Sequence, residues 1–188
     1  FAQTPEIGGT RFIKNPDRLN AVLDQVNNDS QTNYLGTLGQ MYVDIQQDIE
    51  NTDAESLQRT RYIVIFLSDG IPQVQNGNSS SGIQDDDDIQ QEVQRIRALT
   101  ERADVNGFEF HTFLLRGAIS DATVLGYAQQ VLEKMAQAGE GNFTEFQDAE
   151  SIGFLSFISL QLAVEYLVKY VIAYNVNTIP GTEIVELD

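Results

Sequence analysis

One short segment constrains the fold of this chain more than any other. Residues 62–67 form an unbroken run of β-branched, aromatic and aliphatic side chains, and the run ends at Ser68-Asp69-Gly70. A strand that is apolar on both faces is typical of the centre of a parallel sheet that is covered by helices on both sides. We therefore expect an α/β protein built around this strand.

Helical and strand-like segments alternate along the rest of the chain. Apolar residues recur at helical spacing over 17–26, 35–49, 89–103, 121–139 and 149–163. Composition typical of strands occurs over 108–115, 142–146 and 166–176. Loops are predicted over 1–16 and 71–88. This order predicts an α/β fold with a mainly parallel, doubly wound, Rossmann-like sheet, right-handed crossovers and an extra C-terminal strand.

The length of 188 residues is enough for one domain with a substantial core. We predict a single domain over 1–177. Residues 178–188 follow a polar stretch and contain Pro180-Gly181, so they are predicted to be a linker.

Composition excludes several classes of function. The chain has 28 Asp and Glu against 11 Lys and Arg, a net charge of −17, so it repels nucleic acids and anionic membrane surfaces. It has no Cys and one His, which excludes thiol catalysis, disulfides and the usual zinc sites. A metal ion would have to be a hard cation held by oxygen atoms. We also expect no transmembrane segment, because polar residues interrupt the most apolar stretch, 152–176.

Two polar motifs stand where an α/β sheet usually binds its ligands, at the carboxyl ends of the strands. Ser68-Asp69-Gly70 ends the buried strand, and Thr32-Asn33 precedes a predicted helix. A carboxylate and hydroxyl groups can hold a hard cation directly or through water. The alternative is that Asp69 makes an Asx-type turn before Pro72.

With these motifs in this order, the sequence resembles the von Willebrand factor A family. The resemblance implies a dinucleotide-binding-like α/β fold and a cation on three loops at the top of the sheet, the metal-ion-dependent adhesion site. Thr32, in Gln-Thr-Asn-Tyr-Leu-Gly-Thr-Leu, looks like the Thr of the second loop. Asp69 looks like the Asp of the third loop, with Ser68 in place of the usual threonine. Residues 107–113, 141–146 and 148–152 resemble later strands and the closing helix of the family.

The sequence departs from the family at its first loop. No Asp-x-Ser-x-Ser is present, and Phe1-Ala-Gln resembles the end of the family's second strand, so the first strand and helix are missing. A sheet without its central strand would leave the neighbouring strands unpaired. We therefore expect either a longer native chain, which we favour, or a second chain that completes the sheet.

The resemblance implies a protein-binding or adhesion module of a secreted or cell-surface protein. Its partner, a protein ligand or a neighbouring subunit, would complete the coordination of Mg²⁺, Mn²⁺ or Ca²⁺. Thr32 and Asp69 are the expected metal ligands, and Ser68 is expected beside them as a hydroxyl that does not itself hold the ion. The alternative is a degenerate, metal-free domain that serves as a structural or assembly subunit. An enzyme is not expected, because a single His and no Cys leave few bases or nucleophiles.

Two further features have simpler interpretations. The run 85–88 consists of four Asp, but it lacks the ligand spacing of an EF-hand loop and is predicted to be a solvated helix start. His111 lies inside a predicted strand, where a structural histidine is expected rather than a catalytic base.

Overall fold

The computed structural model describes residues 33–76, 79–147, 167–175 and 181–187. In chain order its elements are α2 (Tyr34–Asn51), α3 (Ala54–Leu57), β1 (Thr60–Ser68), β2 (Gln73–Asn76), β3 (Ser79–Ile83), α4 (Asp86–Arg102), β4 (Gly107–Leu115), the 3₁₀ turn η1 (Arg116–Ala118), α5 (Ala122–Ala138), β5 (Glu140–Phe146), β6 (Leu167–Asn175) and β7 (Gly181–Leu187).

The main sheet has five strands in the order β5-β4-β1-β6-β7. Strand β1 is central, and it pairs in parallel with β4 on one side and with β6 on the other. Strand β5 extends the parallel arrangement, whereas β7 is an antiparallel edge strand. The predicted α/β fold with a mainly parallel sheet is therefore confirmed, and residues 62–67 lie in its central strand as expected.

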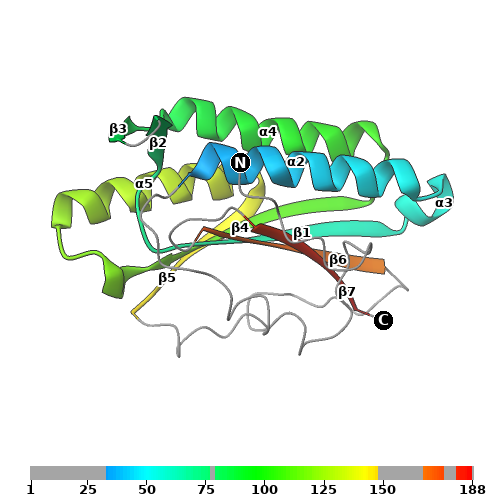
Figure 1. Cartoon of the computed structure of the whole chain (residues 1–188). Coiled ribbons are helices and arrows are strands. Elements are labelled where there is room, and N and C mark those ends of the chain that lie inside the picture. Colours follow the sequence, from blue (N-terminus) through cyan, green and yellow to red (C-terminus); the bar gives the residue numbers. More distant parts are fainter. Residues whose placement is uncertain (1–32, 77–78, 148–166, 176–180, 188) are drawn as a thin grey trace.

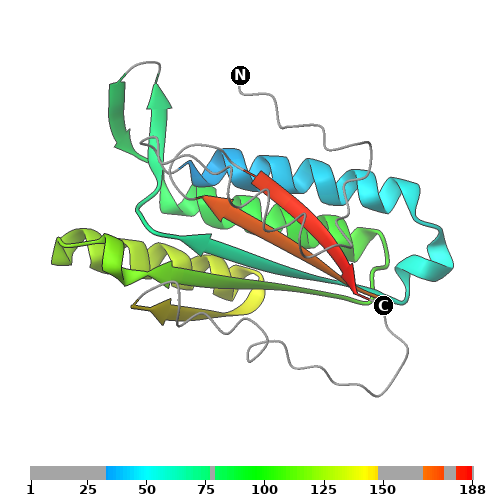
Figure 2. The same ribbon diagram turned by 60° about the horizontal axis from the view of Figure 1, so that its bottom comes forward.

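Helices α2, α4 and α5 cover one face of this sheet (Figures 1 and 2). Side chains at alternate positions of β1, namely Tyr62, Val64 and Phe66, join the core beneath these helices. The period of two in a strand directs Ile63 and Ile65 to the opposite face, where they are 4% and 5% exposed. Both faces of β1 are thus buried, which explains its unbroken apolar sequence.

The C-terminal part of the described chain differs from the prediction. We predicted one extra strand and a linker over 178–188, but Gly181–Leu187 forms β7, which pairs with β6 along seven residues from Val168↔Leu187 to Tyr174↔Gly181. Gly181 is the first residue of this strand, so Pro180-Gly181 does not end the fold. The β-branched residues after it supply a strand that hydrogen bonds to the outer edge of β6, a tertiary pairing that local composition does not reveal.

Strand β1 is paired on both sides within this chain. Because the first strand of the family has no counterpart in the sequence, we expected a longer native chain or a second chain to complete the sheet; in the structure β6 pairs with β1 from Thr60↔Leu167 to Ser68↔Asn175. The order of motifs along the sequence does not reveal that a strand from later in the chain pairs with β1.

The predicted loop over 71–88 contains a small hairpin, β2–β3, which projects beyond the helical layer (Figure 2). The predicted helices over 35–49, 89–103 and 121–139 correspond to α2, α4 and α5. The predicted loop over 1–16 and the predicted helices over 17–26 and 149–163 lie outside the described residues.

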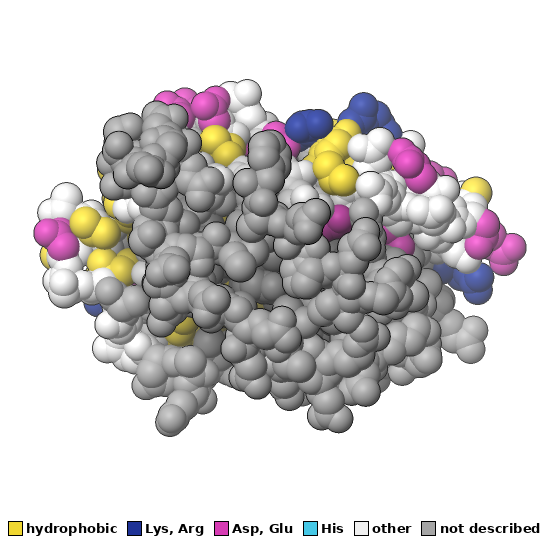
Figure 3. Space-filling model, viewed as in Figure 1, with side chains coloured by type: hydrophobic (Ala, Val, Ile, Leu, Met, Phe, Trp, Pro, Cys, Tyr) yellow, Lys and Arg dark blue, Asp and Glu magenta, His cyan; other side chains and the backbone are white. Residues whose placement is uncertain are grey.

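Within the described part of the chain, no helix is long and apolar enough to cross a membrane. Acidic and basic side chains both lie along the helical side of the molecule (Figure 3). Ion pairs join several of them, among them Arg95–Glu92 and Arg97–Glu101 on α4.

Candidate functional site

The candidate site lies at the carboxyl end of β1, the central strand, where Ser68 ends the strand and Asp69 and Gly70 begin the following turn. Helix α2 begins beside this turn, because the Tyr34 hydroxyl at its first residue contacts both Ser68 and Gly70. Two segments more than 30 residues apart in sequence therefore meet at the edge of the sheet where parallel α/β folds usually bind ligands.

Asp69 is the most unusual group at this edge. Its side-chain oxygen Oδ1 is buried, and it has no hydrogen-bond partner among the described residues. Burial raises the pKa of this carboxyl group above its usual range, because a desolvated carboxylate is less stable. Most buried polar atoms in proteins have a partner, so an oxygen without one calls for an explanation, such as a bound ion.

Ser68 is fully buried and its hydroxyl is already engaged. Its hydroxyl donates to the Tyr34 hydroxyl, with 2.8 Å between the two oxygens, and the backbone N–H of Gly70 donates to Ser68 Oγ at 3.3 Å. Both contacts tie Ser68 to residues beside the turn.

The start of α2 is fixed by a second set of polar contacts. Asn33 is the N-cap, and its Oδ1 accepts the backbone N–H of Gly36 at 2.9 Å. Gln84, which precedes α4, donates from Nε2 to the same oxygen at 2.6 Å, and its Oε1 accepts the backbone N–H of Leu35 at 3.1 Å. The Gln84 side chain thus ties α2 to the segment that leads into α4.

Thr32, the other predicted ligand, lies outside the described residues, immediately before the N-cap Asn33. The structure therefore describes one of the two predicted ligands. The sequence analysis did not single out Tyr34 or Gln84, although they make most of the contacts at this edge. Tyr34 belongs to the apolar stripe of an amphipathic helix, and Gln84 is one of many polar residues in a predicted loop, so neither carries a local signal.

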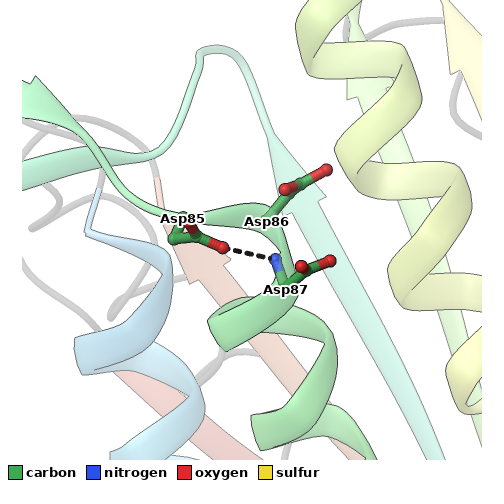
Figure 4. A group of neighbouring side chains, drawn as sticks. All are labelled: Asp85, Asp86 and Asp87. Atoms are coloured by element: carbon green, nitrogen blue, oxygen red, sulfur yellow. Dashed lines mark hydrogen bonds between the residues drawn. The ribbon is translucent and has the colours of Figure 1, made fainter.

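The Asp cluster at the start of α4 is explained by the helix. Carboxylate oxygens of Asp85, Asp86 and Asp87 lie within 4.8 Å of one another. Asp85 is the N-cap and accepts the backbone N–H of Asp87 at 2.9 Å (Figure 4). Asp86 points toward α5, where it pairs with Lys134, and this contact lowers the pKa of Asp86. The predicted helix start is confirmed.

His111 is buried in β4 and has structural contacts. Its Nδ1 accepts the backbone N–H of Asn142 from β5 at 3.2 Å, so its Nε2 carries the proton that faces Glu109 at 2.9 Å. Glu109 in turn pairs with Arg61 of β1. Burial, with a smaller contribution from the Arg61 charge, lowers the pKa of His111. A neutral histidine that bridges neighbouring strands agrees with the predicted structural role.

Comparison with known proteins adds no relative to this description. No known family matches the chain, and neither curated proteins nor solved structures contain a match. The function is therefore inferred from the chain's own residues.

Proposed function

We propose that this chain is a protein-binding module of the von Willebrand factor A type, which holds a divalent cation at the carboxyl end of its sheet and engages a protein partner there. The observation that carries the proposal is the buried Oδ1 of Asp69, which has no partner among the described residues. The carboxylate is an oxygen ligand of the kind that Mg²⁺, Mn²⁺ and Ca²⁺ prefer, and a cation would compensate its charge.

A divalent cation therefore fits the oxygen ligand that Asp69 offers. Asp69 would hold the ion, with Thr32 as the second ligand that the family resemblance implies, and Ser68 would lie beside them. The ion would supply an open coordination position for a carboxylate of the partner. Adhesion and an extracellular or cell-surface location belong to the same proposal, as does a binding function rather than an enzymatic one.

The sheet topology supports the finer expectation of a doubly wound fold. From β1 the chain passes through α4 to β4 and through α5 to β5, always in one direction across the sheet. Strand β6 lies on the other side of β1, so the strand order reverses at β1, as it does at the switch point of a doubly wound sheet. Ile63 and Ile65 are buried on the face opposite the helices α4 and α5, as expected for a central strand of such a sheet.

The alternative proposal is a metal-free domain of the same type that serves as a scaffold or assembly subunit. Two observations favour it. The Ser68 hydroxyl is occupied by Tyr34 and Gly70, and β1 is paired on both sides, by β4 and by β6.

Cation binding separates the two proposals. We expect isothermal titration with Mn²⁺ to detect a site that Asp69→Asn weakens at least about tenfold, since loss of a charged ligand removes the main attraction for the ion. Asp104→Asn is the matched control, because it removes the same charge from an exposed residue that belongs neither to the turn 68–70 nor to the Asp cluster at the start of α4. Equal Mn²⁺ affinity of Asp69→Asn and the native chain would reject the cation site and leave the scaffold proposal.

A further inference from the structure

The turn that carries Asp69 is held on both sides by one side chain. The Tyr34 hydroxyl donates its proton to the carbonyl oxygen of Gly70 at 2.9 Å and accepts the hydroxyl of Ser68, whose Oγ lies 2.8 Å away. These two residues flank Asp69 in sequence. One hydroxyl thus bonds the residues on both sides of Asp69.

The Tyr34 ring has little freedom to move. It is fully buried, and it packs edge-on against Phe66 of β1 with 5.0 Å between ring centroids. Phe66 stacks in turn on Phe110 of β4 at 5.9 Å. The packing of these three aromatic rings therefore fixes the Tyr34 hydroxyl beside the turn 68–70.

The helix that carries Tyr34 is fixed at the same point. Gln84 is 6% exposed, and its amide bonds both the N-cap Asn33 and the backbone of Leu35, on either side of Tyr34. The Gln84 carbonyl oxygen also accepts the Tyr127 hydroxyl of α5 at 3.3 Å. The start of α2, the end of β1 and the approach to α4 consequently form one connected hydrogen-bonded unit around Asp69.

We propose that Tyr34 is a positioning residue for the candidate cation site: its hydroxyl holds the turn 68–70 so that Asp69 keeps the orientation that binds a divalent cation. This inference rests on the proposed function and names the residue on which the affinity of the site depends. Groups that orient a metal ligand without touching the ion typically change metal affinity by about 10- to 100-fold when they are removed.

Tyr34→Phe tests the proposal, because it deletes the hydroxyl and retains the ring that packs against Phe66. Tyr62→Phe is the matched control. It also removes a hydroxyl from a fully buried tyrosine, one that donates to Asp48, but six residues before Ser68 on β1 and so roughly 20 Å from the site. For both variants and the native chain, the Mn²⁺ dissociation constant is measured by isothermal titration and the melting temperature by circular dichroism in chelator.

We expect both variants to lower the melting temperature to a similar extent, and only Tyr34→Phe to weaken Mn²⁺ binding, by about tenfold or more. Equal Mn²⁺ affinity of Tyr34→Phe and the native chain would overturn the positioning role. So would an equal loss of affinity in Tyr62→Phe, since the effect would then follow from general destabilisation.

Asp69→Asn, measured beside them, separates this inference from the proposed function. If Asp69→Asn abolishes Mn²⁺ binding and Tyr34→Phe does not change it, the cation site stands and the role of Tyr34 is rejected. If neither variant changes binding, the proposed function fails and the inference fails with it. Should Tyr34→Phe not fold, Ser68→Ala removes one of the two hydrogen-bond partners of the Tyr34 hydroxyl, and native Mn²⁺ affinity in that variant would equally reject the proposal.

Discussion

Neutralising Asp69 should stabilise the fold when no cation is present. The folded chain buries Oδ1 of this carboxylate without a described partner, and burial raises its pKa above the ordinary value. A raised carboxyl pKa means that ionisation is less favourable in the folded chain than in the unfolded chain. The folded state therefore loses stability as the pH rises from the ordinary pKa through the raised one, and the penalty is fully present above the raised pKa.

The size of the effect follows from the burial. Asp69→Asn keeps an oxygen in the same position and removes only its charge, and the Asp69 side chain is only partly buried, so the gain is placed at the lower end of the about 1–3 kcal/mol that an unpaired buried polar group costs. Asp69→Asn should therefore raise the free energy of unfolding by about 1 kcal/mol in chelator. For a chain of this size that corresponds to an increase of about 2–4 °C in melting temperature.

A bound cation should make the native chain more stable than Asp69→Asn. At a Mn²⁺ concentration of about one hundred times the dissociation constant, binding to the folded state adds about 2.7 kcal/mol to the native chain. Asp69→Asn should gain far less, so the native chain becomes the more stable of the two. Circular dichroism melting curves of both chains, recorded in chelator and over a Mn²⁺ titration, measure both differences.

Two results would refute this reasoning. If Asp69→Asn is less stable than the native chain in chelator, the carboxylate makes a favourable contact that the argument omits. If Mn²⁺ stabilises both chains equally, the ion binds elsewhere. Asp121→Asn is a useful reference, because Asp121 accepts the backbone N–H groups of Thr123 and Val124, which lower its pKa. Loss of its charge should lower the melting temperature in chelator and leave the Mn²⁺ effect intact.

Three further predictions concern the framework of the site. Gly141→Ala should destabilise the fold by about 1–3 kcal/mol in urea unfolding, because the added Cβ would lie 2.0 Å from the carbonyl oxygen of Phe110. Gly126→Ala, where nothing lies within 4 Å, should instead add about 0.5–1 kcal/mol, and a similar loss in both would contradict the steric argument. His111 should titrate below its ordinary pKa of 6.5, so the urea midpoint should fall as the pH drops below that value; an imidazole NMR titration midpoint at or above 6.5 would contradict this. Phe66→Ala should cost about 3–5 kcal/mol in urea unfolding, because the ring is fully buried, and a loss below about 1 kcal/mol would show that its aromatic contacts are dispensable.

The sequence by itself determined the elements of the fold where local patterns are strong. The apolar run at 62–67 predicted a central strand, and β1 is buried on both faces. Helical spacing predicted α2, α4 and α5, and Asp121 caps α5. These features depend on neighbours along the chain, since periodicity and capping act within one or two turns. The same holds for the Asp residues at the start of α4.

Only the tertiary structure decided what surrounds Asp69 and what pairs with β1. The sequence placed Asp69 at the carboxyl end of a central strand. The burial of its Oδ1 and the hydrogen bonds of the Tyr34 hydroxyl to Ser68 and Gly70 depend on the packing of α2 against β1. The pairing of β6 with β1, and the strand β7 at 181–187 where a linker was predicted, likewise join segments far apart along the chain. The physical reason is the same in each case: hydrogen bonds between distant segments and the desolvation of a carboxylate are set by packing, and no local run of residues records them.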